Sequence, residues 1–247
     1  MIKTSFSTAT GLALLGLALL TGACGGDDGA EPDTDGEPAA SSEVSTQAPT
    51  ALSLTSAALE SLPAAALSAA PGYTQKEATA EQLSAAREIF AAQFTDDLEG
   101  FEILRFLNPG VSVDHPQAPN GTLVVECGTL SSDHAPQLLP LMDGMRETGL
   151  TDFGPELQER YNAASIEEVD EAADLGDRGW GLKIMIDGSA MFSMGDSSVE
   201  FPDLPFTMLV FVRSNALVKI SAYYDAGLDP LAVARAVDTA LVQAETR

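Results

Sequence analysis

The two histidines of the chain each directly follow an aspartate, in the segments VDHP (His115) and SDHAP (His134). Imidazole nitrogens and carboxylate oxygens are common metal ligands, so the two pairs together could hold a metal ion. Neighbouring residues on a helix or strand point in different directions, however, and tight sites usually draw three or four ligands from recognisable spacings. We therefore expect His134 in the first turn of a helix, His115 in a turn, and no bound metal or other cofactor.

Cys127 is the candidate nucleophile, because a thiol beside an imidazole can be activated for covalent catalysis. Its surroundings, TLVVECG, predict an apolar strand, which favours a packing role for the thiol. The chain also lacks the Gly-x-Ser-x-Gly turn of serine hydrolases, phosphate-binding glycine loops and paired-cysteine metal spacings. We therefore predict that the protein is not an enzyme. The alternative is a hydrolase or metal-dependent enzyme in which His115, His134 and Cys127 converge.

The only tryptophan, Trp180, is flanked by glycines in the segment GDRGWGL. Glycine lets a backbone or a ligand approach closely, and an aromatic side chain beside it can form the wall of a pocket. Tyr73 and Tyr223 are the tyrosines that we expect to join Trp180 in a candidate ligand pocket. The alternative is that a lone tryptophan fills a gap between a helix and a sheet.

The elements that would position these residues begin with a helix over residues 78–98, which opens with a capping box of Thr79 and Gln82. Strands are expected within residues 100–110 and 122–128, each next to a turn. The expected apolar face of the first helix consists of Leu83, Phe90, Phe94 and Leu98.

A second helix is expected over residues 133–149, bent at Pro140 and ended by Gly149. The acidic stretch that follows is ambiguous, and we expect only a short helix around residues 155–161.

The last third of the chain predicts strands at residues 180–187 and 190–194, then a hairpin over 206–224 that turns at Ser214-Asn215. A terminal helix is expected after Asp229, which would cap it. The buried stripe of that helix would consist of Val233, Val237 and Leu241. The order helix, strands, helix, strands, helix predicts an α+β fold, in which helices pack on a mainly antiparallel sheet within one domain over residues 51–247.

The first 23 residues have the layout of a secretory signal peptide: Lys3, an apolar run from Gly11 to Leu20, and small residues before Cys24. A retained membrane-spanning helix is the alternative, although it would need about 20 apolar residues. Residues 24–50 are rich in Gly, Pro, Ser, Thr and acidic side chains and too poor in apolar ones to fold. They predict a disordered acidic tether.

The segment LTGAC resembles the lipobox of bacterial lipoproteins, in which a small residue precedes a cysteine that is acylated and becomes the new N-terminus. Gly22 and Ala23 fit this pattern, Thr21 stands where leucine is usual, and Leu20 lies one position further back. The resemblance implies that Cys24 carries acyl chains such as palmitate and anchors an exported protein to the cell membrane, outside the cytoplasm. The alternative is a disulfide between Cys24 and Cys127.

The net charge is −25, from 37 acidic and 12 basic side chains. Such a surface repels phosphate backbones, and no stripe of Lys and Arg offsets it. The composition therefore excludes nucleic acid as a partner. The partners that we expect are therefore the membrane and either a small molecule or another envelope protein.

The segments LGDRGWGLKIMI and LVFVRSNALVKISAYYDAGLDPLAVARAVDTAL resemble the closing part of sensor-type bacterial lipoproteins and receptor-kinase extracellular domains. In those proteins a Leu-Gly-Asp leads into a strand, and an Arg-x-Asn hairpin precedes the terminal helix. ALSAAPGYTQ resembles their Leu-Pro-x-Gly-Tyr opening, whereas the disulfides of the kinase domains have no counterpart here. The resemblance implies a non-catalytic binding or sensing module of the cell envelope with an unknown ligand. A structural adaptor for another envelope protein is the remaining alternative.

Overall fold

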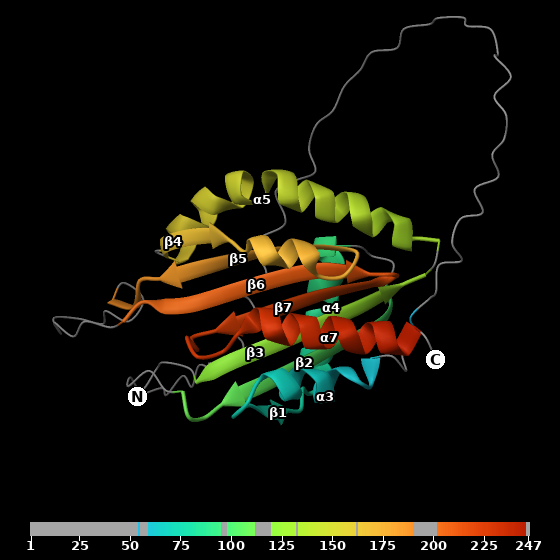
Figure 1. Ribbon diagram of the computed structural model, residues 1–247, viewed down its shortest axis with the longest axis horizontal. Helices are drawn as coiled ribbons and strands as arrows, with labels where there is room; N and C mark the ends of the chain where they lie inside the picture. The colour runs from blue at the N-terminus through green and yellow to red at the C-terminus, as the bar shows by residue number, and fades with distance from the viewer. Residues whose placement is uncertain are drawn as a thin grey trace, which may run out of the picture.

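The computed structural model describes Leu54 and residues 59–94, 98–111, 120–131, 133–161, 163–189 and 202–245. These residues form a seven-stranded antiparallel sheet with helices on both faces (Figure 1), so the predicted α+β fold is confirmed. In chain order the strands are β1 (Thr74–Lys76), β2 (Leu98–Asn108), β3 (Gly121–Leu130), β4 (Ala163–Glu168), β5 (Arg178–Ile186), β6 (Leu204–Arg213) and β7 (Ala216–Tyr223). The helices are α3 (Leu62–Ala69), α4 (Ala80–Phe94), α5 (Leu138–Tyr161) and α7 (Pro230–Glu245), with 3-10 turns η1 (Ala135–Gln137) and η2 (Asp170–Asp174).

The strand order β1-β2-β3-β7-β6-β5-β4 divides the sheet into two runs of sequence neighbours. Strands β1 to β3 form one run and β4 to β7 the other, and the two meet where β3 pairs with β7. At this junction Glu126 lies opposite Lys219, and their side chains form a buried ion pair with Nζ and Oε2 2.7 Å apart. The hairpin between β6 and β7 turns at Ser214-Asn215, as the sequence predicts.

One face of the sheet is covered by α3, α7 and η2 (Figure 1). Helix α7 is capped as predicted, because Asp229 Oδ1 accepts hydrogen bonds from the backbone N–H groups of Leu231 (3.0 Å) and Ala232 (3.1 Å). Its predicted buried stripe is also confirmed, since all three members are fully shielded from solvent: Val233, Val237 and Leu241.

The opposite face carries α4 and α5. The predicted capping box of α4 is confirmed, because Thr79 N–H donates to Gln82 Oε1 (3.0 Å) and Gln82 N–H donates to Thr79 Oγ1 (3.2 Å). The predicted apolar face is wrong at its two ends. Leu83 is 37% exposed, two turns before the point where Phe90 packs on the sheet, and Leu98 is already the first residue of β2.

Helix α5 differs most from the sequence prediction, because it runs through Gly149 without a break and includes the predicted short helix at 155–161. Gly149 is buried against Trp180: a Cβ atom at this glycine would lie 2.6 Å from Trp180 Cζ2. The glycine therefore makes room for an aromatic side chain and does not end the helix. Pro140 lies in the first turn of the helix, where backbone N–H groups have no partner within the helix. Its missing N–H therefore costs no hydrogen bond.

Several predictions concern residues beyond those that the structure describes. These are the signal peptide, the tether, Cys24, His115 and the strand at 190–194. Strands β1 and β4, which the sequence did not predict, form the two edges of the sheet. No helix in the described part of the chain has both the length and the apolar character needed to cross a membrane.

Candidate functional site

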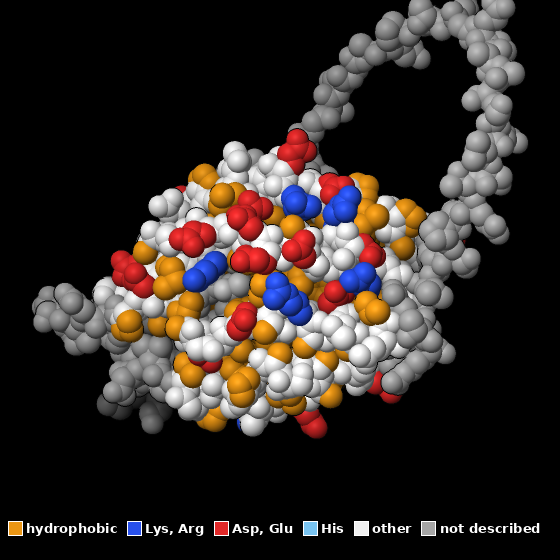
Figure 2. All heavy atoms as spheres, in the orientation of Figure 1, with side chains coloured by type: hydrophobic (Ala, Val, Ile, Leu, Met, Phe, Trp, Pro, Cys, Tyr) orange, Lys and Arg blue, Asp and Glu red, His pale blue; other side chains and the backbone are white. Residues whose placement is uncertain are grey.

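A cleft of about 450 Å³ lies between α5 and the segment that joins β4 to β5. Figure 2 shows acidic and basic side chains gathered over the upper and middle parts of the view, where Figure 1 places α5 and the strands below it, whereas the lower part, over α3, is largely neutral and apolar. The cleft is lined by Asp143, Arg146 and Glu147 of α5, by Glu168, Val169, Asp170 and Ala173 at the end of β4 and in η2, and by Gly179 and Trp180 of β5.

The two walls of the cleft are fixed by ordinary backbone geometry. On α5, Asp143 and Glu147 are four residues apart and therefore share one face of the helix. The opposite wall is held to β5 by a hydrogen bond from Val169 N–H to the Gly181 carbonyl (2.9 Å). Gly179 permits this packing, because a Cβ atom there would overlap the carbonyl oxygen of Ala172. The glycines that flank Trp180 thus allow other parts of the protein's own chain to pack closely against β5.

The charges of the cleft are largely unpaired. Asp143 Oδ1 accepts a hydrogen bond from Arg178 Nε at 3.0 Å, and both side chains are about half exposed. Glu147, Glu168 and Asp170 make no hydrogen bond or ion pair with any residue that the structure describes. Four carboxylates therefore face a cleft that has one basic side chain, Arg146, in its lining.

Trp180 is 2% exposed and packs beneath α5. Its indole N–H has no acceptor among the described residues, and Ser221 Oγ is the other buried side-chain atom in that part of the chain without a partner. Buried polar groups in folded proteins are nearly always hydrogen-bonded. The indole nitrogen is itself shielded from solvent, so this unpartnered N–H lies in the core beneath α5.

The structure does not place the three predicted pocket aromatics around one cleft. Tyr223 shares the core cluster of Trp180, but it stacks on Phe206 (ring centroids 4.7 Å apart), four positions along β6 from the residue that pairs with Trp180. Tyr73 lies in the core cluster on the other face and donates a hydrogen bond to Asp225 Oδ2 (2.9 Å). Burial, reinforced by that hydrogen bond, raises the pKa of Tyr73 above its usual value. Of the three, Trp180 alone lines the cleft described above.

The alternative catalytic residues are not brought together in the described structure. Cys127 is 1% exposed in the core under α3 and α7, where burial and, secondarily, the charge of Glu102 raise its pKa to about 12. The thiolate that nucleophilic catalysis requires is therefore suppressed at neutral pH. His134 directly precedes η1, and its Nδ1 lies 2.9 Å from Ser131 Oγ. The described residues hold no group of three or more His, Cys, Asp or Glu side chains placed for a metal ion.

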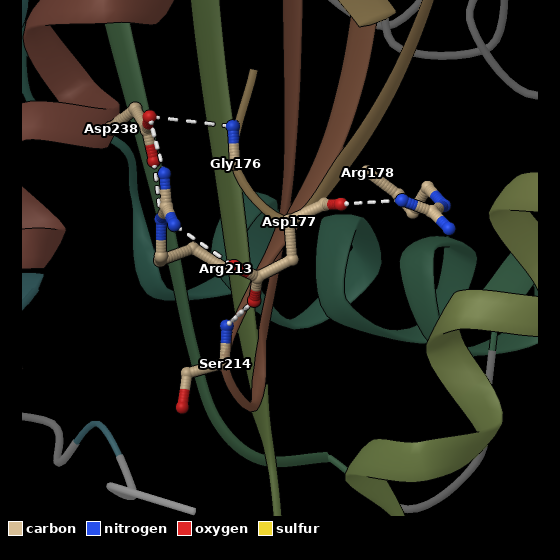
Figure 3. A network of polar contacts seen from close by, with 6 residues as sticks. All are labelled: Gly176, Asp177, Arg178, Arg213, Ser214 and Asp238. Carbon is tan, nitrogen blue, oxygen red and sulfur yellow. Dashed lines mark hydrogen bonds and ion pairs between the residues drawn. The ribbon is translucent and has the colours of Figure 1, made fainter. Parts of the chain in front are cut away.

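The Leu-Gly-Asp and Arg-x-Asn segments meet in a polar network at one end of the sheet (Figure 3). Arg213 binds Asp238 of α7 through two hydrogen bonds, from Nε (2.7 Å) and from the second guanidinium nitrogen (2.8 Å). The carboxylate of Asp177 accepts from Arg213 (2.9 Å) and from the backbone N–H of Ser214 (2.7 Å), so it caps the hairpin turn. Gly176 adopts a left-handed φ of +59° in this network, and a Cβ atom there would overlap the Val212 carbonyl.

Asn215 completes the same corner from inside the core. Its side-chain Oδ1 accepts from Leu54 N–H (2.6 Å), and its Nδ2 donates to the carbonyls of Leu130 (2.7 Å) and Leu54 (3.3 Å). One buried side chain thus joins the hairpin to the end of β3 and to the first described residue of the chain. Both motif segments hold the fold together, and neither contributes a carboxylate or an aromatic side chain to the cleft other than Trp180 itself.

The cleft residues apart from Trp180 were not predicted as site residues. Glu168 and Asp170 lie in an acidic stretch whose secondary structure the sequence leaves ambiguous, and Asp143 and Glu147 resemble any exposed acids of a helix. The one sequence signal that leads to this site is the lone tryptophan between glycines.

No family model matches the chain, and no curated protein matches it in sequence. Among solved structures, the chain is similar to the extracellular domain of PknH from Mycobacterium tuberculosis, at 10% sequence identity and a TM-score of 0.39. That match covers 78% of this chain and 94% of the other. A likeness at this level carries no function, which rests on the residues of this chain.

Proposed function

We propose that the protein is an exported, lipid-anchored envelope protein whose domain binds or senses a small molecule without transforming it. The observation that carries the binding function is the cleft beside Trp180. Its volume of about 450 Å³ falls within the range of small-molecule sites. Its walls come from α5 and from the end of β4 with η2, and both walls pack on β5, which suits a site that must keep its shape.

The described chemistry supports binding over catalysis. Cys127 is buried with a raised pKa, and it faces the opposite side of the sheet from the core that contains Trp180. The carboxylates of the cleft have no histidine or cysteine among their neighbours in the lining. The cleft has charged side chains and a defined shape, and these features serve to bind a ligand.

The anchor rests on Cys24 and the segments around it. The signal-like leader, the lipobox-like LTGAC and the acidic stretch after it together favour acylation of Cys24 and a tether between membrane and domain. A tether that joins the domain at its N-terminal end agrees with the described structure, because Asn215 holds Leu54, at that end of the domain, in the core.

The anchor is tested by intact-mass analysis and membrane fractionation of the full chain and of Cys24→Ser. We expect the wild type to lose residues 1–23, gain the mass of acyl chains and fractionate with membranes. The Cys24→Ser variant should carry no lipid mass. A wild-type protein that is released in soluble form without added mass contradicts the anchor.

The binding function is tested separately by filling the cleft. Ala173, a half-buried lining residue, is replaced by Phe, and Ala236 of α7, which is also half-buried, is replaced by Phe as the matched control. Small molecules that change the fluorescence of Trp180 in the wild type and in Ala236→Phe should not do so in Ala173→Phe. A panel of anionic, neutral and cationic compounds that leaves Trp180 unchanged in all three proteins contradicts a ligand site at this cleft.

A further inference from the structure

We draw no further inference here: the strongest candidate, the edge of β2 over residues 99–104 that faces away from β3, pairs with no strand in the described part of the chain, and nothing in the structure shows what covers it.

Discussion

Replacing Gly149 by alanine should destabilise the protein, although the same change in most helices stabilises it. Glycine inside a helix costs about 0.5–1 kcal/mol relative to alanine, because it loses more backbone freedom on folding. At Gly149, however, the new Cβ atom would lie 2.6 Å from Trp180 Cζ2 and 3.0 Å from Cε2. Overpacking of this kind costs about 1–3 kcal/mol, so the clash outweighs the gain in helix propensity.

Gly144 provides the control within the same helix. A Cβ atom at Gly144 meets nothing within 4 Å, and the residue is exposed. Gly144→Ala should therefore raise the free energy of unfolding by about 0.5–1 kcal/mol. The two alanine variants should differ by about 2 kcal/mol, with opposite signs relative to the wild type.

The assay is urea unfolding followed by far-ultraviolet circular dichroism, with Trp180 emission recorded on the same samples. We expect the emission of Gly149→Ala to shift, because the indole must move, and that of Gly144→Ala to stay unchanged. If Gly149→Ala is stabilised as much as Gly144→Ala, Trp180 does not pack against the helix as described. The account of why α5 continues through Gly149 is then wrong.

Three further predictions concern Arg213, the buried ion pair of Glu126 and Lys219, and the thiol of Cys127. Arg213→Lys should lower the free energy of unfolding by about 1–2 kcal/mol, because lysine cannot reproduce the two-point contact with Asp238. A variant that unfolds in urea at the same concentration as the wild type would refute this prediction. Glu126→Gln should cost about 3–5 kcal/mol by leaving the buried charge of Lys219 unpaired, whereas the double variant Glu126→Leu/Lys219→Met should unfold at a urea concentration near or above that of the wild type. Cys127 should resist iodoacetamide at pH 8.5 in the native protein and react in urea. Since its folded pKa of about 12 exceeds the ordinary thiol value of 9.0, its contribution to stability is complete below pH 9 and declines as the pH rises toward 12; rapid native alkylation would contradict this.

The sequence predicts those elements whose signals are local. The capping box at Thr79 lies within four residues of chain, as do the cap at Asp229 and the turn at Ser214-Asn215, and all three are found in the structure. Gly149 shows the limit of such signals. A glycine after a helical stretch usually marks the end of a helix, and only the distant Trp180 explains why this one does not.

The candidate site was harder to predict than the fold. Trp180 attracts notice because it is unique, but Tyr73 and Tyr223 are linked to it by residue type alone. Tyr73 lies on the other face of the sheet, and Tyr223 packs on Phe206, four positions along β6 from the residue that pairs with Trp180. Glu147 and Asp170 come from α5 and η2, and their types are common on any acidic surface. The edge strands β1 and β4 are short and have no clear strand pattern in their sequences. They form because they pair with β2 and β5.

The buried ion pair at the β3–β7 junction has a consequence for how the sheet is aligned. Every other neighbouring pair of strands is also consecutive along the chain, so the connecting segment limits how far one strand can slide past the next. Strands β3 and β7 have no such direct connection. A slip by one residue would turn their apolar side chains to the wrong face, and a slip by two would set Lys219 opposite Val124 or Gly128 and leave both charges buried alone. A contact that adds little net stability thus selects one alignment at the only place where the two halves of the described sheet could mispair.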